Sequence, residues 1–134
     1  NRLGLADKAS AVLAPEVLLP AVAQGAIGVE IRTDDAATAA RLVPLNDAPT
    51  EACIAAERAF LAALDGSCKT PIAGLAVIEA DGGLAFRGQI LTSDGVEVHE
   101  TGRRGSLGEA RELGLDAGRE LAARAGPGFF EMAS

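Results

Sequence analysis

Apolar residues recur along the chain with two different spacings, and the spacing changes near residue 70. From Asp47 to Leu64 they fall three or four positions apart, as on one face of a helix, and Pro49 suits the first turn of such a helix. From Pro71 they alternate with other residues, as they do in strands. The second half of the chain is therefore expected to begin with a helix and to continue as a sheet.

Two Asp-Gly turns divide the alternating part of the sequence. Asp81-Gly82-Gly83 and Ser93-Asp94-Gly95 each separate two alternating runs, which is a strong signal for hairpins. The sequence therefore predicts an antiparallel meander of three strands. The expected strands are 71–80, 84–92 and 96–101.

A long helix is expected after the third strand. Ser106 and Glu109 stand three positions apart, which is the pattern of a capping box, and Gly126-Pro127 marks the end of the helix. The apolar stripe between these signals consists of Ala110, Leu113, Ala117 and Leu121. Helix, three strands and helix together predict an α+β fold, with a three-stranded antiparallel sheet covered by helices.

The first 45 residues have a different pattern of apolar positions, which predicts separate short elements. The spacing of Leu5, Ala9 and Val12 predicts a short helix over 2–13, and 16–25 is expected to be an extended connector. Alternation predicts a strand over 26–32, with Ile27, Val29 and Ile31 on one side. A helix is expected over 36–43, because acidic residues before it favour a helix N-terminus.

Length and charge limit the classes of protein that this chain can represent. Its 134 residues suffice for one domain, or for one domain with pieces of a neighbour. A net charge of -7 argues against nonspecific binding to nucleic acid or anionic membranes. There is neither an apolar run of roughly 20 residues nor a signal-peptide pattern, so the protein is expected in the cytoplasm. Because the chain opens on Asn1, upstream sequence is expected to have been removed.

The two cysteines stand in different contexts. Cys68 lies in a predicted loop beside Lys69, and a nearby lysine favours the thiolate. These residues alone leave an ordinary loop cysteine as an open alternative. Cys53 lies on the apolar face of its predicted helix and is expected to be a small buried hydrophobe. Both thiols are expected to be reduced, since no secretory signal accompanies them.

Other candidate sites receive less support. His99 has no cysteine at metal-ligand spacing, so no metal site is expected. Gly25 and Gly28 lead into a strand instead of from a strand into a helix, which excludes a dinucleotide fingerprint. Arg103-Arg104-Gly105 could bind an anion, but an exposed, solvated turn after the third strand is the favoured interpretation.

Three stretches stand in an order and spacing that resemble those of a known family. They are Arg2-Leu3-Gly4-Leu5, the segment 19–32 with its Pro20-Ala21 and Gln24-Gly25 pairs, and the Cys68 loop preceded by Ala56-Glu57-Arg58-Ala59-Phe60. Over essentially its whole length the chain resembles the C-terminal portion of porphobilinogen deaminases, also called hydroxymethylbilane synthases. Ala23 departs from the glycine usual in that family, and alanine tolerates a positive φ less readily.

The resemblance implies an activity and a covalent cofactor. The family is a transferase of tetrapyrrole biosynthesis, which leads to heme and chlorophyll, and joins four porphobilinogen molecules into hydroxymethylbilane with release of ammonia. Its dipyrromethane primer is held by a thioether, and the matching residue is Cys68. Gln24 and Gly25 match a segment that lines the same cleft, and Arg2 matches an arginine that binds substrate. Arginine suits the acetate and propionate groups of pyrroles, because its planar fork binds carboxylates bidentately.

The resemblance also implies a division into domains. Residues 1–20 would end the second domain, 21–45 would supply a strand and a helix returning to the first, and 46–134 would form the C-terminal domain that anchors the cofactor. The family's catalytic aspartate has no counterpart, so no catalytic residue is expected in this chain. The chain is therefore expected to be inactive alone, to need the missing N-terminal domains as partners, and to work as a monomer.

Two other functions remain open at this point. The chain could be a noncatalytic α+β binding or association domain with a free thiol. It could also be a redox or acyl-transfer enzyme that uses Cys68 directly, in which case His99 is the only candidate imidazole base. No Gly-x-Ser-x-Gly turn supports a serine hydrolase.

Overall fold

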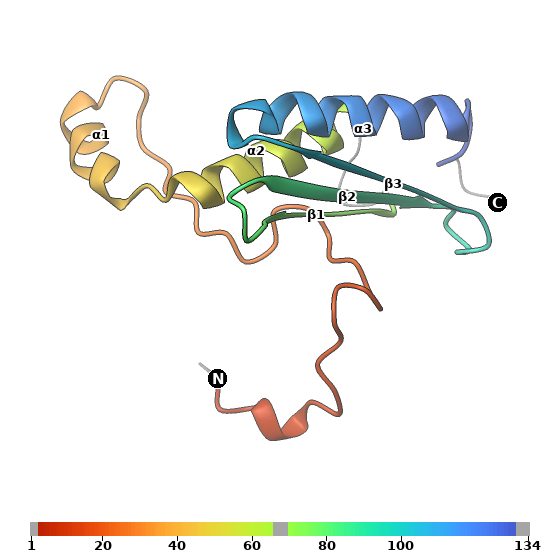
Figure 1. Cartoon of the computed structure of the whole chain (residues 1–134). Coiled ribbons are helices and arrows are strands. Elements are labelled where there is room, and N and C mark those ends of the chain that lie inside the picture. The colour runs from red at the N-terminus through yellow and green to blue at the C-terminus, as the bar shows by residue number, and fades with distance from the viewer. Residues whose placement is uncertain (1–2, 66–69, 131–134) are drawn as a thin grey trace.

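The computed structural model describes residues 3–65 and 70–130. Its main body is an α+β domain, as predicted, in which helices α2 and α3 lie side by side over one face of a three-stranded sheet (Figure 1). The helices span Ala48–Ala63 (α2) and Ala110–Ala125 (α3), and the strands span Ile72–Ile78 (β1), Leu84–Leu91 (β2) and Val98–Gly105 (β3). A smaller helix, α1, spans Ala36–Leu42.

Helix α2 begins where the sequence predicts. The Asp47 side chain accepts a hydrogen bond from the Thr50 N–H at 2.9 Å, and Pro49 lies in the first turn, where its missing N–H costs nothing. The helix ends at Ala63, with Leu64 as its C-terminal cap. Helix α1 is capped in the same way, because Asp35 Oδ1 accepts from the Thr38 N–H at 3.0 Å.

The predicted meander is confirmed. Strand β2 lies in the middle and pairs antiparallel with both β1 and β3, so that β1 and β3 are the edge strands. Gly82 and Gly95 have φ values of +84° and +71° in the two connecting turns, a conformation that glycine adopts without strain. The two Asp-Gly signals therefore mark both hairpins correctly.

The third strand is longer than predicted. It continues through Gly105, which pairs with Leu84, so Arg103 and Arg104 lie within β3 and the predicted exposed turn is wrong. The helix-facing positions of this strand include Thr101 and Arg103 instead of apolar residues. The apolar alternation that marks the other strands is therefore absent, although the backbone pairing continues.

Helix α3 follows β3 almost directly. The capping box forms as predicted: the Ser106 N–H donates to Glu109 Oε2 at 2.8 Å, within a short 3-10 turn, Leu107–Glu109, that precedes the helix. Gly126 caps the other end with a φ of +73°. The core between helices and sheet consists of Ala56, Phe60, Leu64, Ile72, Ala76, Leu84, Phe86, Ile90, Ala110, Ala117 and Leu121. None of the helices in the described ranges has the length and hydropathy needed to cross a bilayer.

The part of the chain before α1 departs most from expectation. Of the helix predicted over 2–13, the described residues 3–13 form only one 3-10 turn, Ala6–Lys8, and no strand forms over 26–32. These residues run away from the sheet (Figure 1), and Val12 and Ile27 are 94% and 95% exposed. A short isolated helix is marginal in water, and a strand needs a pairing neighbour. The described part of the chain offers neither segment a surface to pack against.

Candidate functional site

The predicted cofactor-lining residues Gln24 and Gly25 lie in a turn formed by Val22–Gly25. Gly25 has a φ of +77°, and Ala23 has a φ of +58°. The second value is unusual, because the left-handed conformation brings Cβ of an alanine close to the backbone. The departure noted at Ala23 thus coincides with a strained position.

The turn is fixed to the domain through β1. The Gly74 N–H of that strand donates to the Pro20 carbonyl at 2.9 Å, and Val22 packs against the core. The Ala23 N–H donates to Oε2 of Glu57, on α2, at 2.5 Å. Segment 20–25 therefore lies along the free edge of β1.

A cavity of about 300 Å³ opens between this turn, α2 and β1. Its lining is mostly apolar or neutral, and Glu57 is the only charged residue in it among the described residues. The lining consists of Gln24, Gly25, Ala26, Pro49, Thr50, Cys53, Ile54, Glu57, Leu75, Ala76 and Ile78. A hollow of about 670 Å³ also borders Gly25 and Ala26; Arg58 lines it together with Asp47 and Glu51.

Cys53 is a free, half-buried thiol in the first cavity. It packs against the core from the predicted apolar face of α2. Burial raises the pKa of the thiol, and the nearby Glu57 and Asp47 carboxylates raise it further. A protonated thiol is a weak nucleophile, so the structure favours a packing role for Cys53.

Two predicted site residues, Cys68 and Arg2, lie outside the described residues. The elements on either side of Cys68 are described, since α2 ends at Ala63 and β1 begins at Ile72. The prediction that Cys68 falls between a helix and the first strand is thus consistent with the order of the elements. Its role stays a prediction.

Arg103 is part of an ion-pair network that its sequence context did not predict. Its Nε lies 2.6 Å from Asp116 Oδ2, and its Nη2 lies 2.6 Å from Glu120 Oε2. The hydrogen bond from Arg103 Nη2, and after it the one that Thr101 Oγ1 donates to Glu120 Oε2 at 2.8 Å, lower the pKa of Glu120 from 4.5 to about 2. The spacing of Asp116 and Glu120 by one helical turn was the available signal. Arg103 is therefore engaged within the domain.

Arg104 and His99 are also paired. Arg104 Nη2 lies 2.8 Å from Glu79 Oε1, across the sheet from β3 to the end of β1. His99 Nε2 lies 2.9 Å from Glu97 Oε1, and its ring centroid is 5.2 Å from that of Phe129. Within 3–65 and 70–130, no group of three or more His, Cys, Asp or Glu side chains could hold a metal ion.

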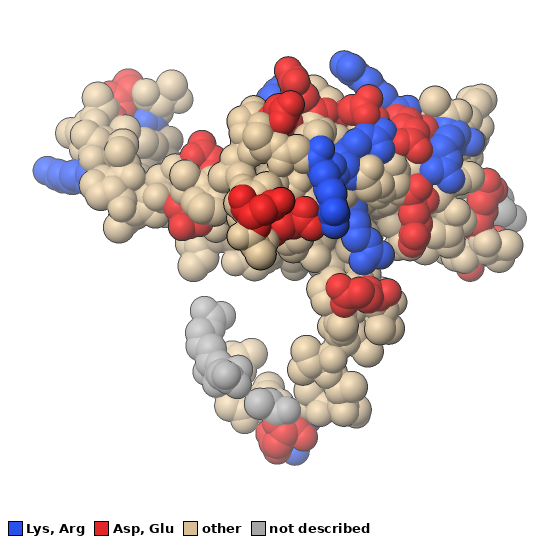
Figure 2. Space-filling model, viewed as in Figure 1, with Lys and Arg blue, Asp and Glu red and all other residues tan. Residues whose placement is uncertain are grey.

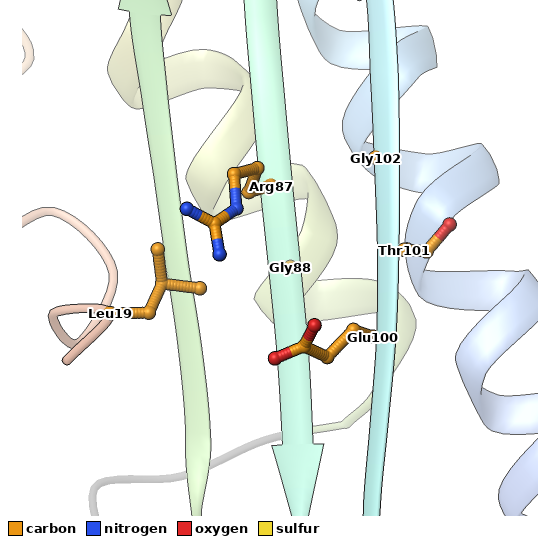
Figure 3. Close-up of a pocket in the computed structure, with 6 residues that line it drawn as sticks. All are labelled: Leu19, Arg87, Gly88, Glu100, Thr101 and Gly102. Atoms are coloured by element: carbon orange, nitrogen blue, oxygen red, sulfur yellow. The ribbon is translucent and has the colours of Figure 1, made fainter. Parts of the chain in front are cut away.

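A separate pocket of about 260 Å³ lies on the face of the sheet opposite the helices. Figure 3 shows Arg87 of β2 extending toward Leu19, with Glu100 of β3 on the same side. The other lining residues are Gly88, Thr101 and Gly102. It shares no lining residue with the cavity at the Gln24 turn, so the two are independent sites.

The geometry defines a small α+β domain with a connector turn fixed to one edge of its sheet. Comparison with protein families identifies its class more closely. A model described as "Porphobilinogen deaminase, C-terminal domain" matches residues 51–123, and one described as "Porphobilinogen deaminase, dipyromethane cofactor binding domain" matches residues 1–40. The chain belongs to the porphobilinogen deaminase family.

Individual relatives agree with the family models. The porphobilinogen deaminase of Nitrobacter hamburgensis is 48% identical over 132 residues, covering 98% of this chain and 42% of the relative. The chloroplastic porphobilinogen deaminase of Pisum sativum is 48% identical over 132 residues, covering 97% of this chain and 36% of the relative. The chain thus spans about two fifths of the length of these relatives, in their C-terminal part. This membership disfavours the noncatalytic alternative.

Proposed function

We propose that this chain is the C-terminal part of a porphobilinogen deaminase that joins four porphobilinogen molecules into hydroxymethylbilane and releases one ammonia at each condensation. The observation that carries the proposal is the identity of 48% to the Nitrobacter hamburgensis enzyme across 98% of this chain. The reaction is a transferase reaction of tetrapyrrole biosynthesis. Further partners would be the rest of the same protein, and the working form would be a cytoplasmic monomer.

Cys68 would hold the dipyrromethane cofactor through a thioether. A thiolate is the soft nucleophile that such a bond requires, and Lys69 beside it favours deprotonation. The bound cofactor supplies the primer on which the product is built. A tether keeps the growing chain close to the site of reaction, so each condensation proceeds at a high effective concentration. The family model matching residues 1–40 is named for this cofactor, which supports its presence in the whole protein.

The Gln24–Gly25 turn fits one wall of a site for the dipyrromethane cofactor. Gln24 offers neutral amide donors, and the space beside Gly25 is open, since a Cβ there would meet no atom within 4 Å. Among the described residues, no lysine or arginine lines the cavity that Gln24 and Gly25 share, and Arg58 lines only the neighbouring hollow at Gly25. Pyrrole carboxylates need cationic partners, so Gln24 and Gly25 would form a neutral wall, while Arg2 and residues of the missing domains would bind the carboxylates.

The proposed domain division gives each part a different task. Residues 46–134 would carry the cofactor, 1–20 would end the second domain, and 21–45 would return to the first. No carboxylate of this chain is assigned to proton transfer, because the family's catalytic aspartate has no counterpart here. The chain alone is therefore expected to form no hydroxymethylbilane.

The test is an assay of a completed deaminase, in which residues 1–134 are joined to the upstream part of the Nitrobacter hamburgensis relative. We expect the completed deaminase to form hydroxymethylbilane and Cys68→Ser to lose that activity by more than about a hundredfold. Cys53→Ser is the matched control and is expected to retain it. A folded completed deaminase without activity would contradict the proposal, as would a fully active Cys68→Ser variant.

A further inference from the structure

Glu57 is the one charged side chain that is buried among the described residues, with 4% of its surface exposed. Burying a carboxylate is costly unless hydrogen-bond donors replace its water. The residue lies on α2 in the apolar stripe that also holds Cys53 and Phe60, where an uncharged side chain would pack at lower cost. Its position therefore needs a reason other than core packing.

Both carboxylate oxygens of Glu57 bind backbone N–H groups. Oε1 accepts from the Ala76 N–H at 2.9 Å, and Oε2 accepts from the Ala23 N–H at 2.5 Å. Ala76 belongs to β1, whose only partner strand in the described sheet is β2. The carboxylate thus fills a hydrogen-bonding position on the free edge of β1 and links that edge to the connector turn.

The second of these bonds fixes the residue whose backbone is strained. A left-handed φ is unfavourable for an alanine, because it brings Cβ close to the backbone, and Ala23 has a φ of +58°. A hydrogen bond to a charged group is stronger than one between neutral groups, so the Glu57 carboxylate can hold that conformation. The neighbouring Pro20 carbonyl and the Val22 side chain attach the start of the turn, but they do not fix its strained residue.

We propose that Glu57 is a positioning residue, which holds the Gln24–Gly25 turn against the domain through the Ala23 amide and so fixes the cofactor-lining wall relative to α2. We call the two hydrogen bonds that the Ala23 and Ala76 N–H groups donate to Glu57 the clamp. The clamp rests on this geometry alone, whereas its effect on enzymatic activity rests on the proposed function. The carboxylate of Glu57 therefore links helix α2, the free edge of β1 and the connector turn.

The clamp is tested first by amide hydrogen exchange in the completed deaminase. In Glu57→Gln the single amide oxygen can accept from only one of the two N–H groups. We expect it to face the more deeply buried Ala76 N–H, which leaves the NH₂ group toward the Ala23 N–H. We expect the Ala23 amide to be protected in the unsubstituted protein and to exchange at least about tenfold faster in Glu57→Gln. Glu112→Gln, on the exposed side of α3, is the matched control and is expected to leave that rate unchanged.

The role in positioning is tested by a double substitution. Ala23→Gly removes the strain that the clamp must hold, because glycine adopts a positive φ freely. We expect Glu57→Gln to lower kcat/KM for porphobilinogen at least about tenfold in the cofactor-loaded fraction, and Ala23→Gly to restore most of that loss. A merely structural glutamate would lower the unfolding temperature without this rescue, and loaded enzyme with unchanged kcat/KM would overturn the proposal.

The two readouts separate failure of the clamp from failure of the proposed function. A protected Ala23 amide in a protein that forms no hydroxymethylbilane would leave the clamp standing and refute the activity. An unprotected Ala23 amide in an active enzyme would overturn the clamp alone. If Glu57→Gln does not fold, the exchange rate of the unsubstituted protein still decides, and the double variant with Ala23→Gly supplies the comparison of activity.

Discussion

Residues 3–35 and residues 48–125 contain similarly patterned apolar side chains, yet only the second region buries them. In the second region Leu84, Phe86 and Ile90 of β2 are fully or almost fully buried beneath α2 and α3. In the first region Ile27 and Val29, which have the same alternation, are exposed. Figure 2 shows charged side chains of both signs spread over this face of the domain, whereas the N-terminal arm is mostly tan, with acidic side chains near its two ends.

The difference shows what a hydrophobic pattern can and cannot specify. Alternation indicates which face of a strand is apolar, but burial of that face needs other residues to pack against it. Helices α2 and α3 pack against the apolar face of β2. Among the described residues nothing packs against 26–32 closely enough to bury its apolar side, and the relatives of this chain are more than twice as long.

Removal of a core ring is expected to have the largest effect on stability. Phe60 is fully buried, and its ring centroid lies 5.0 Å from that of Phe86. Phe60→Ala should lower the free energy of unfolding by about 3–5 kcal/mol, because it removes apolar contact and leaves a cavity. Urea denaturation of the chain measures the change. A loss below about 1 kcal/mol would show that the domain is not packed as described.

A methyl group added where α2 and α3 cross is expected to lower the free energy of unfolding somewhat less than Phe60→Ala does. A Cβ on Gly114 of α3 would stand 2.0 Å from the Ala56 carbonyl oxygen of α2, so the helices must move apart. Gly114→Ala gains about 1 kcal/mol of helix propensity but should lose more through this clash, for a net loss of about 2 kcal/mol. The control, Gly108→Ala, has room for the methyl group. Equal stabilities of the two variants in urea would contradict the close crossing.

Loss of the Glu120 carboxylate is expected to have a smaller effect that depends on pH. Its pKa is about 2 in the folded protein, against 4.5 ordinarily, so folding favours the ionised form. The resulting stability is fully present above about pH 4.5 and is lost as the pH falls toward 2. Because Glu120 is partly exposed, Glu120→Gln should cost only about 1 kcal/mol at neutral pH.

Thermal unfolding at several pH values measures this dependence. The difference between the unsubstituted protein and Glu120→Gln should shrink below about pH 4.5. Glu112→Gln, which changes the same chemical group elsewhere on α3, should show no such trend. A difference that stays constant down to pH 2 would argue against the ion pair with Arg103.

The smallest effect is expected in the N-terminal region. Ile27→Ala should change the free energy of unfolding of this chain by less than about 0.5 kcal/mol, since the side chain is 95% exposed. In the completed deaminase the same substitution should cost about 1–3 kcal/mol if other domains cover Ile27. Comparing the two proteins in urea sharpens the contrast between the regions. Equal and negligible effects would show that nothing covers Ile27.

The sequence predicted the elements of the domain because their signals are local. Asp47 and the Ser106–Glu109 pair cap helices within a few residues of themselves, and the Asp-Gly turns close hairpins between adjacent strands. Contacts between residues far apart in the chain were harder to predict from the sequence. The end of β3 depends on its register with β2, and the Arg103 network depends on which face of α3 lies over that strand.

The part of the site that the sequence missed is the link between Ala23 and Glu57. The two residues are far apart in the chain, and their bond follows from the course of the connector along the edge of β1. Two signals were present in the sequence. Glu57 interrupts an apolar helix face, and Ala23 occupies a position where the resemblance leads one to expect glycine.

The most direct test of the central claim is the mass of the completed deaminase, measured intact and after digestion. We expect a mass increment of one dipyrromethane, found on the peptide that contains Cys68 and absent from the peptide that contains Cys53. The increment should disappear in Cys68→Ser. An active enzyme whose Cys68 peptide carries no added mass would contradict the account.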